Sequence, residues 1–269
     1  MGASSHEPGG LARGVVGPVR VITFGVSNVA PAGAVVAGLI IMVSYAGFAS
    51  PLVVLIAFAA SLCCAVSIAE FARRLPSAGS LYTYNSRGLG RGGGFLTGWM
   101  MIFAYGLYAP AGIALTSVYA SQLVADAAHV IIASWVLFVV ILAAVAGLAY
   151  LGIATSSWAD LVLVTGEMAV IAALAITILV KTGPAHFSAA MFSPASSPHG
   201  QLSDITNAMI YGIVAFAGFE TAAALGEEAR NTRRSVPAGT AGIVIVTGLF
   251  YLLVVAAEVL GVGRRGVPA

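Results

Sequence analysis

The chain has 269 residues, of which 59% are hydrophobic and only 8% are charged, and its formal net charge is +2. Its mean hydropathy is +1.00. This composition excludes an ordinary soluble domain, gives no sign of nucleic-acid binding, and predicts a polytopic membrane protein.

The predicted membrane spans follow one another from near the N-terminus. Between Val21 and Ala69 there is no Asp, Glu, Lys, Arg or His. A helix needs about 20 apolar residues to cross a bilayer, so two spans fit there. Hydropathy and turn residues together predict seven spans, at residues 19–46, 51–72, 93–125, 130–150, 154–181, 204–227 and 237–262. We therefore expect an all-α polytopic membrane helix bundle.

Two of these spans contain interruptions. In the first span Pro31 lies between Asn28 and Gly33, and in the sixth span residues 215–220 contain Gly218 and lead into a densely charged loop. Non-helical backbone at membrane depth is tolerated only where protein or a watery cavity covers it, because unpaired backbone groups in lipid are costly. Each interruption therefore indicates a binding site.

The basic residues predict the orientation, because they are retained on the cytoplasmic side of a membrane. With the N-terminus inside, the cytoplasmic basic residues are Arg13, Arg20, Arg73, Arg74, Arg87, Arg91, Arg230, Arg233 and Arg234. Those left outside are Lys181, Arg264 and Arg265. We expect a multi-pass protein of the cell membrane with a cytoplasmic N-terminal segment, residues 1–18, that lacks the features of a signal peptide.

The two interrupted spans enter the bilayer from opposite sides, because five spans separate their starting points. Many secondary transporters bind substrate where the first helices of two inverted repeats unwind. This arrangement predicts a first five-helix repeat over residues 19–181, an extracellular loop over 182–203 and the start of a second repeat over 204–269.

Two blocks of the sequence combine glycine, aromatic, charged and proline residues in a distinctive order. The block in the sixth span and its following loop contains Gly218, Phe219, Glu220, Glu227, Glu228, Arg230, Asn231, Arg233, Arg234 and Pro237. The block after the second span contains Glu70, Pro76, Ala78, Gly79, Tyr82, Gly90, Gly94, Phe95, Gly98 and Trp99. Together they resemble the amino acid/polyamine/organocation (APC) superfamily of permeases, and the resemblance covers all seven spans. A proline-bearing first span replaces the Gly-x-Gly stretch of many members.

The resemblance implies a secondary transporter with broken helices 1 and 6, which carries an amino acid or related organic amine by alternating access. It implies a carrier rather than an enzyme, with no cofactor. The sequence has no Gly-rich phosphate loop, so a proton gradient, a sodium gradient or exchange would supply the energy. Members generally have more spans, so the second repeat looks truncated after the seventh. The alternative is a non-transporting remnant or regulatory half-transporter that needs a partner chain.

The substrate site is predicted at the two interruptions, with a tyrosine of the third span as a lid. The predicted binding residues are Ser27, Asn28, Val29, Ala30, Gly33, Tyr105, Ala215, Phe216, Ala217, Gly218, Phe219 and Glu220. The polar members of the first span either bind a substrate carboxylate or satisfy amides freed by the proline. The aromatic members either face the substrate or pack among neighbouring side chains.

Two acidic residues within the spans have alternative roles. Glu220 either caps the second half of the sixth span or balances a substrate ammonium or a coupled proton. Glu167, near the middle of the fifth span, is a candidate for coupling to an ion, or it forms a structural hydrogen bond to a neighbouring helix. The histidines are scattered, so no metal site is expected.

Overall fold

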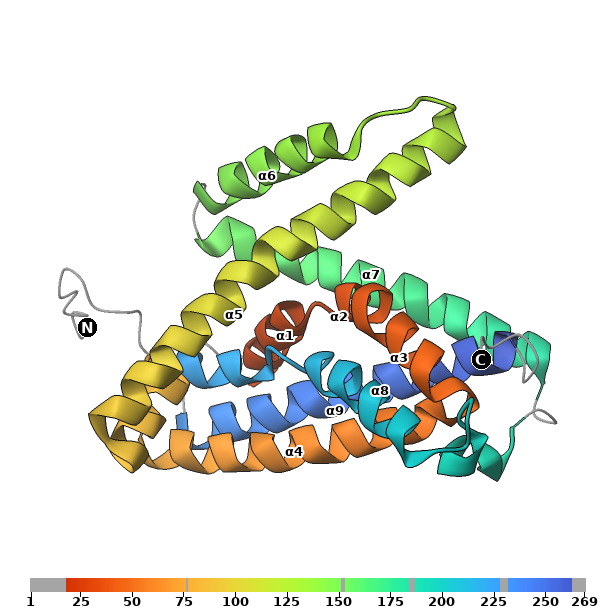
Figure 1. Ribbon diagram of the computed structural model, residues 1–269. Helices are drawn as coiled ribbons and strands as arrows, with labels where there is room; N and C mark the ends of the chain where they lie inside the picture. The colour runs from red at the N-terminus through yellow and green to blue at the C-terminus, as the bar shows by residue number, and fades with distance from the viewer. Residues whose placement is uncertain (1–17, 76, 151–152, 184–186, 228–231, 263–269) are drawn as a thin grey trace. The chain divides into compact units, whose positions relative to one another are not determined.

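The structure is a computed structural model that describes residues 18–75, 77–150, 153–183, 187–227 and 232–262 (Figure 1). Every regular element within these ranges is helical. The segments long and apolar enough to cross a membrane are Val21–Arg74, Ser80–Ala128, Asp160–Thr182, Leu202–Ala224 and Val236–Val262. The predicted all-α bundle of membrane helices is confirmed, and the first segment contains two of the predicted spans.

The chain divides into two compact units. One consists of Met1–Tyr84 and Glu167–Ala269, and the other of Asn85–Gly166. Residues 1–17 of the predicted N-terminal segment and residues 228–231 of the charged loop lie outside the described ranges. Each unit has its own packing and is treated by itself.

In the first unit, the first predicted span is divided into consecutive helical pieces. These are α1 (Pro18–Val29), α2 (Pro31–Ala34), a π-helical turn (Val35–Leu39) and α3 (Ile40–Ala46). A 3-10 turn (Gly47–Ala49) then leads into α4 (Ser50–Arg74), whose first turn contains Pro51. Proline is tolerated there because the first N–H groups of a helix have no intrahelical acceptor.

Helix α9 (Thr232–Val262) is the most buried of the membrane-crossing segments and packs against α4 and α1. Its fully buried side chains include Val236, Ile243, Val244, Tyr251 and Val255. A side chain at Gly248 would clash with the ring of Phe58 on α4, and one at Gly242 would clash with Ile22 on α1. Small residues at these crossings let the helices approach closely, which is how helices associate within a bilayer.

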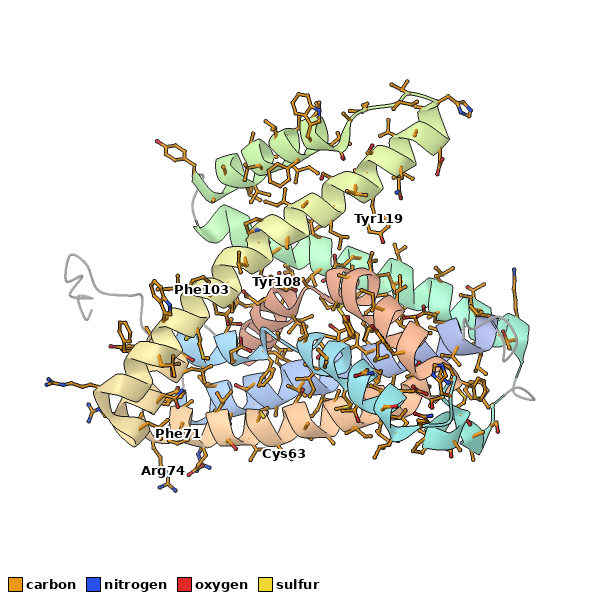
Figure 2. All side chains as sticks on the ribbon, in the orientation of Figure 1. Cys63, Phe71, Arg74, Phe103, Tyr108 and Tyr119 are labelled. Carbon is orange, nitrogen blue, oxygen red and sulfur yellow. The ribbon has the colours of Figure 1, made fainter. Side chains whose placement is uncertain are left out.

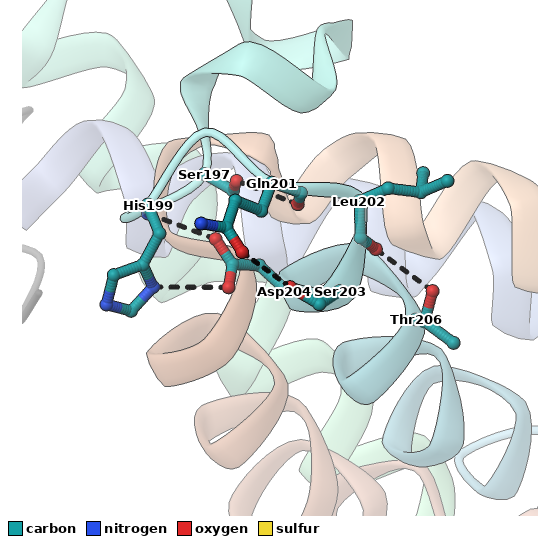
Figure 3. Close-up of polar contacts among 7 residues, drawn as sticks. All are labelled: Ser197, His199, Gln201, Leu202, Ser203, Asp204 and Thr206. Carbon is teal, nitrogen blue, oxygen red and sulfur yellow. Dashed lines mark hydrogen bonds and ion pairs between the residues drawn. The ribbon is translucent and has the colours of Figure 1, made fainter.

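In the same unit, the loop that precedes α8 (Leu202–Val214) packs against α4 and the 3-10 turn Gly47–Ala49. The loop contains 3-10 turns at Ala189–Phe192 and Pro194–Ser196. Asp204, in the first turn of α8, accepts a hydrogen bond from the backbone N–H of His199 at 3.0 Å, and its second oxygen lies 3.2 Å from Nδ1 of His199 (Figure 3). A carboxylate is favoured at this end of a helix because the backbone N–H groups there are free.

The second unit contains most of α5 (Ser80–Ala128), all of α6 (Ser134–Tyr150) and the start of α7 (Ile153–Thr182). Non-helical angles at Gly90, φ 80° and ψ −177°, divide α5 into a short helix and a long one. Asn85 donates a hydrogen bond to Oγ1 of Thr97 at 2.8 Å. Twelve residues of straight helix would extend about 18 Å, so the chain folds back at Gly90. Figure 2 shows the aromatic residues Phe103, Tyr108 and Tyr119 along the long part of α5.

Most predicted span boundaries agree with the helices to within a few residues. The largest difference is at the third span, which was expected from residue 93, whereas α5 begins at Ser80, before the fold-back at Gly90. The seventh span was expected from residue 237 and begins as α9 at Thr232, and the fourth was expected from residue 130 and begins as α6 at Ser134. The second half of the sixth span is a 3-10 helix, Phe219–Glu227, rather than an α-helix.

Candidate functional site

The first span is broken at Ala30, which separates α1 from α2. Ala30 has φ 50° and ψ 67°, a left-handed conformation that costs an L residue about 1–2 kcal/mol. Pro31 explains the break, because it has no N–H and disfavours helical backbone at the preceding residue. The N–H of Ala30 closes the end of α1 by donating to the carbonyls of Ser27 at 3.0 Å and Val26 at 3.2 Å.

The sixth span is broken between the end of α8 and the 3-10 helix. The N–H groups of Phe216 and Ala217 donate to the carbonyls of Ile213 and Val214 at 3.1 and 2.9 Å, which tightens the end of α8. The chain then turns at Gly218, which has φ 112°. The Gly218 carbonyl accepts from both the N–H and the hydroxyl of Thr221, at 3.1 and 2.6 Å, and so starts the second half of the span.

The two breaks meet backbone to backbone. A Cβ atom at Gly218 would lie 2.7 Å from the carbonyl oxygen of Asn28 and 2.9 Å from the backbone N of Val29. Both distances are shorter than a carbon atom tolerates, and neither neighbour is a movable side chain. Glycine is therefore required at this position by its backbone angle and by the closeness of the first span.

Glu220 lies directly at the second break. Its Oε2 accepts a hydrogen bond from the N–H of Gly218 at 2.9 Å. This contact matches the capping alternative for Glu220, in which the carboxylate satisfies a backbone N–H that the break leaves without a helical partner. The other predicted role, balancing a substrate ammonium or a proton, stays a prediction.

Glu167 of α7 approaches the first break from a distant part of the sequence. Its Oε1 accepts a hydrogen bond from the backbone N–H of Ala32 at 3.4 Å. Ala32 is the second residue of α2, so its N–H has no acceptor within the helix. The carboxylate thus lies at the positive end of the half-helix that follows the break.

Tyr251 of α9 holds the second break from the side of the protein core. Its hydroxyl donates to the carbonyl of Ala215 at 2.8 Å, and the Tyr251 side chain is completely buried. The ring of Phe216 lies edge-on to Tyr251, with ring centroids 5.3 Å apart, and stacks on Phe58 of α4 at 6.2 Å. We call these three residues, Phe58, Phe216 and Tyr251, the aromatic clamp.

Comparison with known proteins identifies the family to which these features belong. The family model Amino acid permease matches residues 20–267. The chain belongs to the amino acid permease family. The resemblance to APC permeases, drawn from the two sequence blocks, is therefore confirmed, and the chain is a multi-pass membrane protein.

Several curated relatives are similar to this chain over most of its length. The branched-chain amino acid permease BcaP of Lactococcus lactis subsp. cremoris (strain MG1363) is 28% identical over 231 residues, which are 78% of this chain and 48% of that protein. The cationic amino acid transporter 3, mitochondrial, of Arabidopsis thaliana is 27% identical over 93% of this chain and 42% of that protein. The serine/threonine exchanger SteT of Bacillus subtilis (strain 168) is 27% identical over 70% of this chain and 41% of that protein. The permease chain spans about half the length of the relatives it matches.

The structure brings most of the predicted binding residues together in the first unit, along the two breaks. Gly33 and Ala217 are exposed there, whereas Val29 and Phe216 are each only 1% exposed. The Phe216 ring therefore packs within the aromatic clamp. Tyr105, the predicted lid, belongs to the second unit, where its side chain is 40% exposed.

Asn28 uses its side chain locally. Its Nδ2 donates to the carbonyl of Phe24 at 2.9 Å, one turn earlier in α1. This bond uses one of the two amide hydrogens of Asn28 and leaves the side-chain oxygen and the second hydrogen for a ligand.

Sequence reasoning missed Tyr251 and Phe58. A tyrosine within an apolar span carries a hydroxyl that must find a partner, which is a signal that a polar contact exists. The identity of the partner, 36 residues away at a break, has no counterpart in the sequence pattern.

Proposed function

We propose that this permease chain carries an amino acid or related organic amine across the cell membrane by alternating access. The observation that carries the proposal is the backbone contact of Gly218 with Asn28 and Val29, which joins the two breaks into one place. Non-helical backbone of this kind exposes N–H and carbonyl groups that match the two charged ends of an amino acid. Membership of the family and the names of the relatives support the same activity.

The two breaks offer complementary groups to such a substrate. The backbone N–H groups at the start of α2 would bind a carboxylate, and the carbonyls of Phe216 and Ala217, which follow the end of α8, would bind an ammonium. Gly33 at the first break and Ala217 at the second are exposed and have no side chain or a small one, so their backbone is open to a ligand.

Transport would be driven by a proton gradient, a sodium gradient or exchange, and Glu167 is the candidate for ion coupling. Its carboxylate contacts the Ala32 N–H, so a change in its charge would act directly on the half-helix that binds the substrate. We also propose the inverted repeat that the sequence predicts, in which residues 19–181 form the first repeat and residues 204–269 form the start of the second.

Uptake into proteoliposomes tests the proposal. The chain is reconstituted and offered labelled leucine, arginine or serine, with a proton gradient, with a sodium gradient, or with the same amino acid inside. We expect saturable uptake of at least one of them, and less than about a tenth of that uptake in Gly218→Ala, because the breaks can no longer meet. Gly147→Ala on α6, where a Cβ would meet nothing within 4 Å, is the matched control.

Two outcomes would count against this function. Equal uptake by Gly218→Ala and Gly147→Ala would remove the contact of the breaks from the mechanism. Absence of uptake by the wild type under all three conditions would favour the alternative, a half-transporter that needs a partner chain.

A further inference from the structure

The carbonyl groups at the second break differ in whether they have a partner. The carbonyls of Ile213 and Val214 accept from backbone N–H groups, that of Ala215 accepts from Tyr251, and that of Gly218 accepts from Thr221. Phe216 and Ala217 lie between Ala215 and Gly218, and their carbonyls receive no hydrogen bond from any residue in the described ranges. The break therefore presents two adjacent open carbonyls, at positions set by their bonded neighbours.

Tyr251 is well placed to fix these positions. Its hydroxyl bond to Ala215 is 2.8 Å long, and both residues are buried, at 0% and 4% exposed. An unpaired buried carbonyl is costly, so without the hydroxyl the Ala215 carbonyl would have to move to find another donor. Its ring also contacts the Phe216 ring edge-on, at an interplanar angle of 77°.

The opposite end of the break is held independently. Gly218 touches the backbone of Asn28 and Val29, and its N–H donates to Glu220 at 2.9 Å. Residues 216 and 217 thus lie between two fixed points, one made by Tyr251 and one made by the first span. Only Ala217 among residues 215–218 is exposed.

We infer that Tyr251 is a positioning residue for the proposed substrate site: its hydroxyl and ring hold residues 215 and 216, so that the carbonyls of Phe216 and Ala217 point to the substrate ammonium. The identity of the ligand in this inference rests on the proposed function. The geometry is independent of the proposed function, because the aromatic clamp fixes the break whether or not a substrate is transported.

Tyr251→Phe tests the role of the hydroxyl, because it keeps the ring and its contact with Phe216. We expect the KM for the best transported of leucine, arginine and serine to rise about tenfold, with a smaller change in maximal rate, because a displaced carbonyl weakens binding. The matched control is Tyr45→Phe, which removes the same atom from a ring that stacks on Tyr211 of α8 at 5.8 Å. If the role of Tyr251 were purely structural, Tyr251→Phe would lower the melting temperature and leave the KM of the folded protein unchanged. That result would overturn the inference.

A second measurement needs no transport. In a background of Cys63→Ser and Cys64→Ser, the rate at which N-ethylmaleimide modifies the thiol of Ala217→Cys reports the position of the break. We expect Tyr251→Phe to change this rate several-fold and Tyr45→Phe to leave it unchanged. Equal rates would overturn the inference even where uptake is measured, and a changed rate would support it even where the wild type transports none of the amino acids.

If Tyr251→Phe does not accumulate in the membrane, Phe58→Leu replaces it in the labelling test. This variant keeps the hydroxyl bond and removes the ring on which Phe216 stacks. A changed rate supports the clamp, and an unchanged rate overturns its role in positioning the break.

Discussion

Gly218 and Ala30 reach left-handed backbone angles for different physical reasons. Gly218 has φ 112° and stands against the backbone of the first span, so no other residue fits. Ala30 has φ 50°, and its side chain is accommodated, so the cost is conformational strain alone. The strain is maintained because Pro31 prevents the helix from continuing.

Tyr84→Phe should stabilise the protein. The Tyr84 hydroxyl is buried and has no hydrogen-bond partner among the residues that the structure describes, and its ring stacks on that of Phe71 at 5.5 Å. An unpaired buried polar group costs about 1–3 kcal/mol, and the substitution removes it while keeping the ring. We expect a rise of several degrees in the melting temperature measured in detergent. Tyr82→Phe, at a side chain that is 49% exposed, is the control and should change little.

Substitution of Glu167 should alter the pH dependence of uptake. The carboxylate accepts from the Ala32 N–H, and a neutral amide at the same place accepts more weakly and cannot gain a proton. We expect Glu167→Gln to transport at a rate that no longer varies with external pH. Glu258→Gln on α9 is the control, because Glu258 is also half-buried but bonds to nothing among the residues the structure describes. An unchanged pH profile in Glu167→Gln would refute its role in coupling.

At the scale of elements, the sequence predicts where helices break better than what holds the breaks. Pro31 and Gly218 act on the local backbone, so their effect is readable from a few neighbouring residues. The bonds of Glu167 to Ala32 and of Tyr251 to Ala215 join residues 135 and 36 positions apart. Such pairings depend on which apolar helices pack together, and in a bilayer the lipid-facing and protein-facing sides of a helix are equally apolar. Hydropathy therefore contains little information about them.

Pro31→Ala should join α1 and α2 into one helix. The new N–H at residue 31 and the N–H of Ala32 would bond to carbonyls one turn earlier, so Ala32 would no longer donate to Glu167. We expect uptake in proteoliposomes to fall at least about tenfold, because the N–H groups proposed to bind the substrate would be bonded within the helix. The melting temperature should stay the same or rise. Pro51→Ala is the control, since Pro51 lies in the first turn of α4 and interrupts nothing. Full uptake by Pro31→Ala would show that the break is not needed.

At the scale of the whole molecule, charge and hydropathy determine different features. The length of the apolar segments predicts the helices, and charged residues mark some of their ends, as Arg73 and Arg74 do at the end of α4. The fold-back at Gly90 was not predictable, because Asn85, Thr97 and their hydrogen bond lie in a stretch rich in small residues without a hydropathy pattern. The prediction of the side of the membrane on which each loop lies rests on the basic residues.

The orientation can be tested on intact cells with a thiol reagent that does not cross membranes. In the background of Cys63→Ser and Cys64→Ser, Ser196→Cys lies in the loop before α8, and Arg87→Cys lies in the short helix that follows α4. Arginines at 73, 74, 87 and 91 should hold that helix on the cytoplasmic side. We therefore expect Ser196→Cys to be modified in intact cells and Arg87→Cys only after the membrane is opened. Because both variants carry the same reactive group on the same protein, the reverse pattern would mean that the N-terminus faces outward.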